Sequence, residues 1–391
     1  MNSNSKKIYA GFTLIELMIA MAVTMVILYG AVAAFRDAQQ TNQVITQSAD
    51  MTDNLRTGLN FMIQDIQQAG TGIPTGGIPI PYTSNGSTTN PCGTTAPINR
   101  PILGGAGTFP PCNSVIPAVE PGNELGPPIT APDASTGTVQ NPGSVTDEIT
   151  VMYADNTSGL DAKPIYAPAV ANPPSPGCPN GSLTLTGTQL QVTFDSNCVN
   201  LAAAGITVQS GDLVMLSNSL GSALVYVTSA AGQTLTFASG DPFKLNGRPD
   251  PTGTVKQLMT SSTCNGANAC FPPTTATRIW MISYYLDNVS APPFIRLVRQ
   301  VNFNTPTPVG ETLENLQFTY NFVDGVTNPS NQATVPNGNS ESQIRTVNVW
   351  LAARTSYVVH KGSSRAQTQY ARNNLMTQIS LRSMAYVNKY Q

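Results

Sequence analysis

Charged residues are scarce in this chain. Only 10% of its 391 residues are Asp, Glu, Lys or Arg, and the formal net charge is −2, whereas about 25% is usual in soluble proteins. Such sparse charge of both signs provides no basic face for nucleic acid, so we expect none to be bound directly. A polar, neutral composition of this kind is typical of exported proteins.

The chain also lacks the common signatures of enzymes. It has no P-loop, no G-x-S-x-G and no H-E-x-x-H. His360 is the only histidine, and a surface position explains it more simply than a catalytic one. The acidic pair Asp147 and Glu148 is typical of a turn before a strand. We therefore expect a protein without catalytic residues, although distant carboxylates could still form an acid and base pair.

Metal-binding patterns are weak. No C-x-x-C occurs, which argues against zinc. Residues 155–161, DNTSGLD, gather oxygen ligands but do not have the alternating spacing of an EF-hand. An Asx-rich turn is the commoner meaning of this string. We expect no cofactor, with calcium at this loop as the alternative.

The cysteines are six in number, and all follow the first 90 residues. An even count on the exported side predicts three disulfides formed in an oxidising compartment. Short loop closure favours pairing of neighbours, but all fifteen connectivities remain open. The three neighbouring pairs are Cys92 with Cys112, Cys178 with Cys198, and Cys264 with Cys270.

The chain contains one long apolar run, from Phe12 to Phe35, preceded by Lys6 and Lys7. As a helix, this run would reach about 36 Å, which is enough to cross a bilayer. Glu16 lies within it, and a carboxylate at such depth is unfavourable by roughly a few kcal/mol unless it is paired. Glu16 is therefore a candidate functional residue.

Two ordinary interpretations explain this run less well. A secretory signal peptide would have a shorter apolar region of about 7–15 residues, followed by a small-residue cleavage site. A plain single-pass anchor fits the length of the run but leaves Glu16 without a role.

The stretch Gly11-Phe12-Thr13-Leu14-Ile15-Glu16 resembles the type IV prepilin signature. The resemblance implies that prepilin peptidase cuts after Gly11, removing residues 1–11, and that Phe12 becomes the N-methylated first residue. The new amine of Phe12 would then lie close to Glu16, in the same subunit or in a neighbour packed slightly out of step. This pair would set the axial register between subunits.

The helix should continue well beyond the membrane-length run. Residues 12–36 form the transmembrane or filament-core part, and residues 37–70 form an amphipathic part without proline. Apolar side chains recur there at three- and four-residue spacing, and Gly70 and Gly72 provide a stop. A globular domain would cover this stripe; a free coiled coil is the alternative. The stripe comprises Met51, Leu55, Leu59, Met62, Ile63 and Ile66.

Residues 71–147 are dense in Pro and Gly, and over 71–144 we expect a long irregular loop held by Cys92 and Cys112. Residues 148–391 carry strand signals that predict a β-rich head, mainly antiparallel, with a turn at Gly221-Ser222 and an exposed loop over 324–343. The expected strands are 148–153, 183–194, 213–217, 223–228, 234–238, 278–286, 294–301, 314–323, 345–355 and 377–382.

Aromatic and basic residues gather in two of these strands. Trp280, Tyr284 and Tyr285 lie in the first, and Arg296 and Arg299 in the second. They could form an exposed binding strip, but packing of one face into the core explains the aromatic residues more simply.

Four later segments are similar in order and spacing to PilW-type minor pilins, which are related to the J-type minor pseudopilins of type II secretion. These segments are 211–217 (GDLVMLS), 314–320 (ENLQFTY), 347–355 (VNVWLAART) and 379–382 (ISLR). Relative to that family, the Pro/Gly-rich stretch 71–147 resembles an insertion.

The resemblance implies an α+β, pilin-like fold and a subunit that initiates type IV pilus assembly, at the filament tip, for twitching motility, adhesion or DNA uptake. Its partners would be prepilin peptidase, the other minor pilins and the major pilin, the inner-membrane assembly platform and membrane lipid. The head would lie in the periplasm before assembly and at the cell surface afterwards. A J-type pseudopilin and a membrane-anchored exported adhesin remain alternatives.

Overall fold

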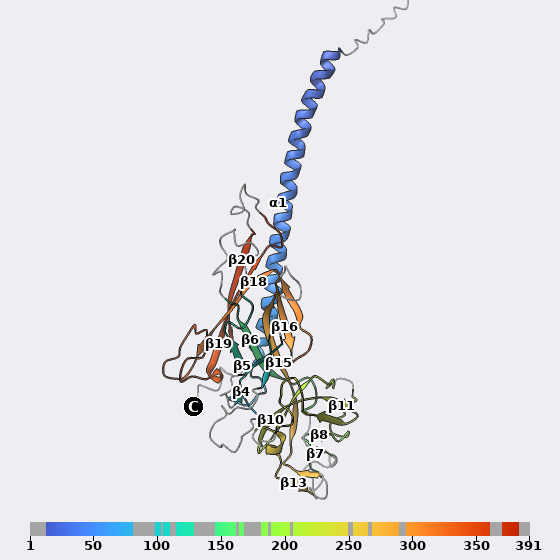
Figure 1. Ribbon diagram of the computed structural model, residues 1–391, viewed down its shortest axis with the longest axis vertical. Helices are drawn as coiled ribbons and strands as arrows, with labels where there is room; N and C mark the ends of the chain where they lie inside the picture. The colour runs from blue at the N-terminus through green and yellow to red at the C-terminus, as the bar shows by residue number, and fades with distance from the viewer. Residues whose placement is uncertain are drawn as a thin grey trace, which may run out of the picture.

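A computed structural model describes most of the chain (Figure 1). The described residues are 13–80, 98–102, 105–109, 115–128, 145–161, 164–167, 181–186, 189–203, 206–248, 253–264, 268–288, 295–359 and 370–382. They form one long helix that projects from an elongated β-rich head, as expected for the α+β class (Figure 1).

Helix α1 spans Leu14–Gln68, 55 residues without a break, and is therefore about 80 Å long. No proline interrupts it, and Thr13 caps its first turn. It ends where Gly70 takes a left-handed φ of 81°, a conformation that glycine adopts without strain. The expected continuous helix and its glycine stop are both confirmed.

The lower half of α1 lies in the largest core of the head. Met51, Leu55, Met62 and Ile66 are all buried, and their spacing places them on one helix face. They pack against two antiparallel sheets, each of which contacts the helix. Burial of each such side chain contributes about 1.5–3 kcal/mol. The predicted amphipathic stripe is thus covered by the head.

The larger of these sheets has seven strands organised around β15. This strand is long enough to pair with β6 along one edge and with both β9 and β16 along the other. The strands are β5 (Val119–Gly122), β6 (Glu148–Asp155), β15 (Thr275–Asp287), β9 (Leu213–Asn218), β10 (Gly221–Tyr226), β16 (Arg296–Val301) and β17 (Thr307–Glu311).

The second sheet has the order β18-β19-β20 and also contacts α1. Its strands are β18 (Leu313–Phe322), β19 (Ile344–Arg354) and β20 (Arg372–Ser380), all antiparallel. Figure 1 shows both sheets beside the lower helix.

A four-stranded sheet, β11-β12-β8-β7, lies at the end of the head farthest from the start of α1 (Figure 1). It packs with β9, β10 and η1 (Val255–Leu258) around a second core. Its strands are β7 (Ser182–Thr186), β8 (Gln189–Thr193), β11 (Ser229–Ala231) and β12 (Thr234–Phe237).

The expectation of an irregular loop over 71–144 is wrong in part. Short strand pairs occur there, and β5 joins the seven-stranded sheet beside β6. Ile78, Ile116 and Val119 are fully buried, so this segment helps to form the core despite its prolines. Pro121 is tolerated because β5 is an edge strand. The pairs are β1 (Ile78–Pro79) with β4 (Val115–Ile116), and β2 (Asn99–Ile102) with β3 (Gly105–Thr108).

Other strand predictions are corrected in detail. The segment 183–194 is a hairpin, β7 and β8, and not one strand. The tight turn near Gly221 lies at residues 219–220, because Gly221 already pairs with Asn218. Strand β20 begins at Arg372, earlier than expected. The sequence did not predict strands β11 and β17, the pair β13 (Ser261–Cys264) and β14 (Asn268–Cys270), or the short 3₁₀ helix η2 (Glu341–Gln343).

Candidate functional site on the N-terminal helix

Glu16 lies in the first turn of α1 and closes a capping box with Thr13. Its Oε2 accepts hydrogen bonds from the Thr13 backbone N–H and hydroxyl, both at 3.0 Å. The Glu16 N–H in turn donates to Thr13 Oγ1 at 3.3 Å. A carboxylate here also compensates the partial positive charge of the helix N-terminus. Within a single subunit, Glu16 therefore stabilises the start of its own helix.

The upper half of α1 is apolar and exposed. Large hydrophobic side chains from Leu14 to Phe35 are between 44% and 80% exposed. Thr24 turns its hydroxyl onto the Ala20 carbonyl at 2.7 Å, so this polar group is satisfied within the helix. By length and composition, α1 could cross a membrane. None of the residues in its apolar, membrane-length stretch is buried in the structure.

A buried polar cluster connects the lower helix to the head. Asp65 accepts hydrogen bonds from the hydroxyls of Tyr153, at 2.9 Å, and Tyr284. Arg299 donates to both of its oxygens, at 2.7 and 3.2 Å. Burial and the nearby Asp65 carboxylate raise the pKa of both tyrosines well above the usual range. Both hydroxyls thus stay protonated and keep donating, which fixes α1 against β6, β15 and β16.

This cluster decides between the two interpretations of the aromatic strip. Tyr284 and Tyr285 are buried, and Trp280 packs at the edge of the largest core with the Arg278 guanidinium 4.7 Å from its ring centroid. Arg299 is occupied by Asp65. The aromatic residues are therefore part of the core, and the exposed binding strip is not formed.

The oxygen-rich loop after β6 is also engaged by the protein itself. Asp155 accepts hydrogen bonds from Arg278 and from the Thr157 N–H and hydroxyl. Arg278 also lies 3.7 Å from Asp212. Among the described residues, no group of three or more acidic, His or Cys side chains could hold a metal.

Several predicted site residues are outside the described residues. Gly11 and Phe12 precede the described residues, so cleavage, methylation and the pairing of the Phe12 amine with Glu16 stay predictions. His360 likewise lies outside. Cys198 and Cys270 are each disulfide-bonded. The cysteines Cys92, Cys112 and Cys178, and the Cys264 side chain, are not described, so the pairing pattern stays a prediction.

Sequence reasoning missed the buried charge clusters of the head. Two of them are the Asp65 cluster and the pair formed by Arg100 of β2 and Glu120 of β5, with 3.6 Å between Nη1 and Oε1. Others join Arg278 to Asp155 and Asp212, and Glu314 to Arg354 and Arg372. Burial raises the pKa of Glu120 to about 8, although Arg100 lowers it. No sequence signal marks any of these clusters, because their members are far apart along the chain.

Comparison with known families gives one match. Residues 6–32 match the model of the prokaryotic N-terminal methylation motif. No curated protein and no solved structure matches the chain. The match covers Gly11, Phe12, Glu16 and most of the exposed apolar run of α1.

This match supports a type IV prepilin-like protein. Such a motif implies processing by prepilin peptidase and assembly with other pilins or pseudopilins. The exposed apolar helix fits a membrane-anchored subunit of that kind. The remaining, much longer part of the chain is not identified by any comparison.

Proposed function

We propose that this chain is a non-enzymatic minor pilin of the PilW type, which helps to initiate type IV pilus assembly. The supporting observation is the division of α1. Its first part, from Leu14 to Phe35, is apolar and exposed and carries Glu16 in its first turn. Its last part, from Met51 to Ile66, is fixed in the head through Asp65. A helix divided in this way presents an uncovered surface to other helices and carries the head with it.

The proposed mechanism depends on helix packing. In the membrane the exposed run contacts lipid, and in a filament it would contact the helices of other subunits instead. Glu16 would exchange its bonds with Thr13 for the amine of a processed Phe12, in its own or a neighbouring subunit. Where this amine belongs to a neighbouring subunit, only one axial register satisfies both groups, because an unpaired charge is unfavourable in an apolar bundle.

The size of the head supports a position at the filament tip or another low-copy place. Residues 148–391 alone exceed half of the chain, and so large a head would hinder close packing along a shaft. At the tip, it has neighbours on one side only. The same location would allow the head to support twitching motility, adhesion or DNA uptake.

The test is replacement of Glu16 with Ala in the native host. We expect normal membrane insertion, because the apolar run becomes more hydrophobic, but a strong loss of surface pili. Asp37→Ala is the matched control, since Asp37 is another exposed carboxylate of α1 but lies beyond the apolar run. Unchanged piliation in Glu16→Ala would contradict the register role.

The same strains separate a pilin from a J-type pseudopilin. If Glu16→Ala abolishes protein secretion and leaves pili intact, the subunit serves a type II secretion system. If the protein retains its full N-terminus in membranes, it is instead an anchored exported protein such as an adhesin.

A further inference from the structure

Strand β20 is an edge strand of the three-stranded sheet, and only β19 pairs with it, without a bulge. Just before β20, the Thr355 N–H donates to the Ala371 carbonyl. Just after it, the Leu381 N–H donates to the Arg345 carbonyl. Hydrogen-bonded residues alternate along an antiparallel pair, so the odd-numbered residues of β20 bond to β19. The N–H and C=O groups of its even-numbered residues point away from the sheet.

These outward-pointing groups form an open row along β20. The Asn374 N–H donates to the Asn373 side chain at 2.9 Å. Further along, no described residue bonds to the backbone N–H or C=O of Met376, Gln378 or Ser380. All three residues are exposed, Met376 by 76%. A row of unpaired backbone donors and acceptors is a template for one more strand.

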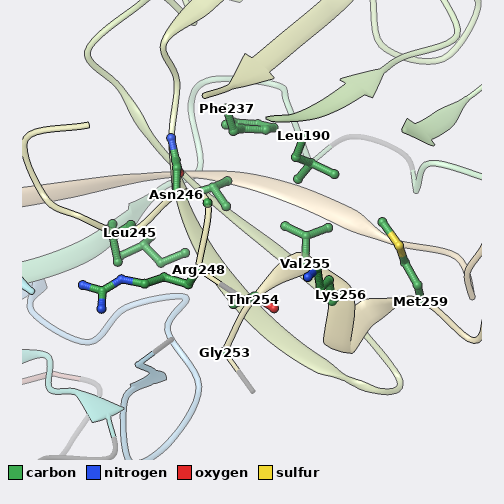
Figure 2. Close-up of a pocket in the computed structure, with 13 residues that line it drawn as sticks. Leu190, Phe237, Leu245, Asn246, Arg248, Gly253, Thr254, Val255, Lys256 and Met259 are labelled. Atoms are coloured by element: carbon green, nitrogen blue, oxygen red, sulfur yellow. The ribbon is translucent and has the colours of Figure 1, made fainter. Parts of the chain in front are cut away.

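The edge strands of the seven-stranded sheet are protected, whereas β20 is not. β5 carries Pro121 and β17 carries Pro308, and proline on an edge strand hinders further pairing. On β10, the Asn246 side chain binds both the N–H and the C=O of Tyr226, at 3.0 and 2.8 Å. Figure 2 shows Asn246 there, beside a small cavity. In β20, residues 373–380 include no charged residue, proline or glycine.

The two faces of β20 define the kind of strand that fits this edge. Ile379 is buried, and Leu375 packs against the core that contains α1. Met376 and Gln378 are exposed on the opposite face. A strand added to an edge continues both faces of the sheet. The fitting strand therefore alternates apolar and polar side chains and carries no charge.

A second copy of this chain does not fit the edge while both copies share a membrane. The strand β20 contacts α1, and the Arg382 N–H just after it donates to the Gln67 carbonyl at 3.4 Å. Figure 1 shows β20 lying lengthwise beside the helix. Two identical edges meet symmetrically only as antiparallel strands. Such a pair would point the two α1 helices in opposite directions, so the added strand must come from a different protein.

We propose that β20 accepts an extended strand from a different subunit of the same assembly. This strand pairs with the backbone of Met376, Gln378 and Ser380, and its apolar side chains extend the core face beside Leu375. The inference rests on the proposed filament role, which supplies a neighbour whose helix points the same way as α1. Strand addition would join the heads, whereas Glu16 acts at the other end of the helix.

Hydrogen exchange of the full chain in detergent, measured residue by residue, tests whether the edge is open. The N–H groups of Leu375, Thr377 and Ile379 should exchange slowly, because they bond to β19. Those of Met376 and Gln378 should exchange at least tenfold faster. Equally slow exchange of both sets would show that the edge is already covered, and it would overturn the proposal.

Photo-crosslinking in the native host tests the partner. A photo-crosslinking residue replaces Gln378, and mass spectrometry maps its product. We expect a product with an uncharged, alternating segment of another subunit of the assembly. Met376→Pro should reduce its yield at least tenfold, because proline removes an outward N–H and leaves the bonds to β19 intact. Met376→Ala, which keeps the N–H, is the matched control and should retain the product.

Three outcomes of the crosslinking would overturn the proposal: no product, a product between two copies of this chain, or equal yields in Met376→Pro and Met376→Ala. An unchanged denaturation midpoint in Met376→Pro shows that the variant is folded. If it does not fold, Gln378 crosslinking in the native chain and hydrogen exchange still decide the question.

The filament role and strand addition can fail separately. If Glu16→Ala leaves piliation unchanged while Met376→Pro loses the crosslinked product, the edge pairs with a strand but the assembly is not a pilus. If Glu16→Ala abolishes pili while Met376→Pro keeps the product, the filament role stands and strand addition is wrong.

Discussion

Asp65 of α1 and Arg299 of β16 form an ion pair at two points, with Nε–Oδ2 and Nη2–Oδ1 distances of 2.7 and 3.2 Å. The two residues are 234 positions apart in the chain. Tyr153 and Tyr284 complete the contacts of the same carboxylate. This cluster is the main polar connection between the helix and the head among the described residues.

Replacing Asp65 with Ala should therefore destabilise the head. The change leaves Arg299 and two tyrosine hydroxyls without their acceptor, and breaking a buried pair typically costs about 3–5 kcal/mol. Because the Arg299 side chain is 26% exposed, we expect roughly 2–4 kcal/mol, measured by denaturant unfolding in detergent. Asp53→Ala, at an exposed position of the same helix, should change stability by less than about 0.5 kcal/mol. Equal losses of stability in Asp65→Ala and Asp53→Ala would show that the Asp65 cluster stabilises the head no more than an exposed carboxylate does.

Gly58 of α1 lies close to Leu297 of β16. A Cβ built there would be 2.8 Å from Leu297 Cδ2, so a larger side chain must displace that leucine. We expect Gly58→Leu to lower the free energy of unfolding by about 1–3 kcal/mol. Gly30→Leu is the control, because a Cβ there meets nothing within 4 Å. If both variants unfold at the same denaturant concentration, the closeness of Leu297 does not restrict the size of the side chain at position 58.

Glu120 should make stability depend on pH. Its folded pKa of about 8 is above its unfolded value near 4.5, so the folded state binds one proton more between these two values. Stability from this group is complete below about pH 4.5, falls by about 1.4 kcal/mol per pH unit as pH rises towards 8, and is flat above. Glu120→Gln should remove this slope, measured as denaturation midpoints from pH 5 to 9. An unchanged slope in the variant would assign the dependence to another group.

The even number of cysteines predicts the result of a further measurement. Three disulfides formed in an oxidising compartment would leave no reactive thiol, so thiol labelling of unfolded, unreduced protein from the native host should detect none. Peptide mapping without reductant should then identify the partners of Cys198 and Cys270. A fully reduced pool would contradict the prediction.

Processing at the N-terminus is the remaining prediction. Intact-mass analysis of the mature protein should find a chain that begins at N-methylated Phe12. Gly11→Val should block the cut, because the resemblance assigns the peptidase site to this glycine, and the precursor should accumulate in membranes. A mature protein that still begins at Met1 would exclude the prepilin interpretation.

The sequence predicts the helix well and the polar clusters not at all. Met51, Leu55 and Met62 repeat locally at helical spacing, so their common face follows from the backbone geometry alone. Asp65 differs, because its partners Tyr284 and Arg299 approach it only after β15 and β16 have paired. For the same reason β5 was missed: Val119 is buried through its pairing with β6, and its local composition, rich in proline, indicates a loop.

Helix α1 runs without interruption from the apolar span into the head. A helix with no proline and no break has no hinge at which it can bend sharply. Any force or rotation applied to the head is therefore transmitted along α1 to its exposed, apolar end.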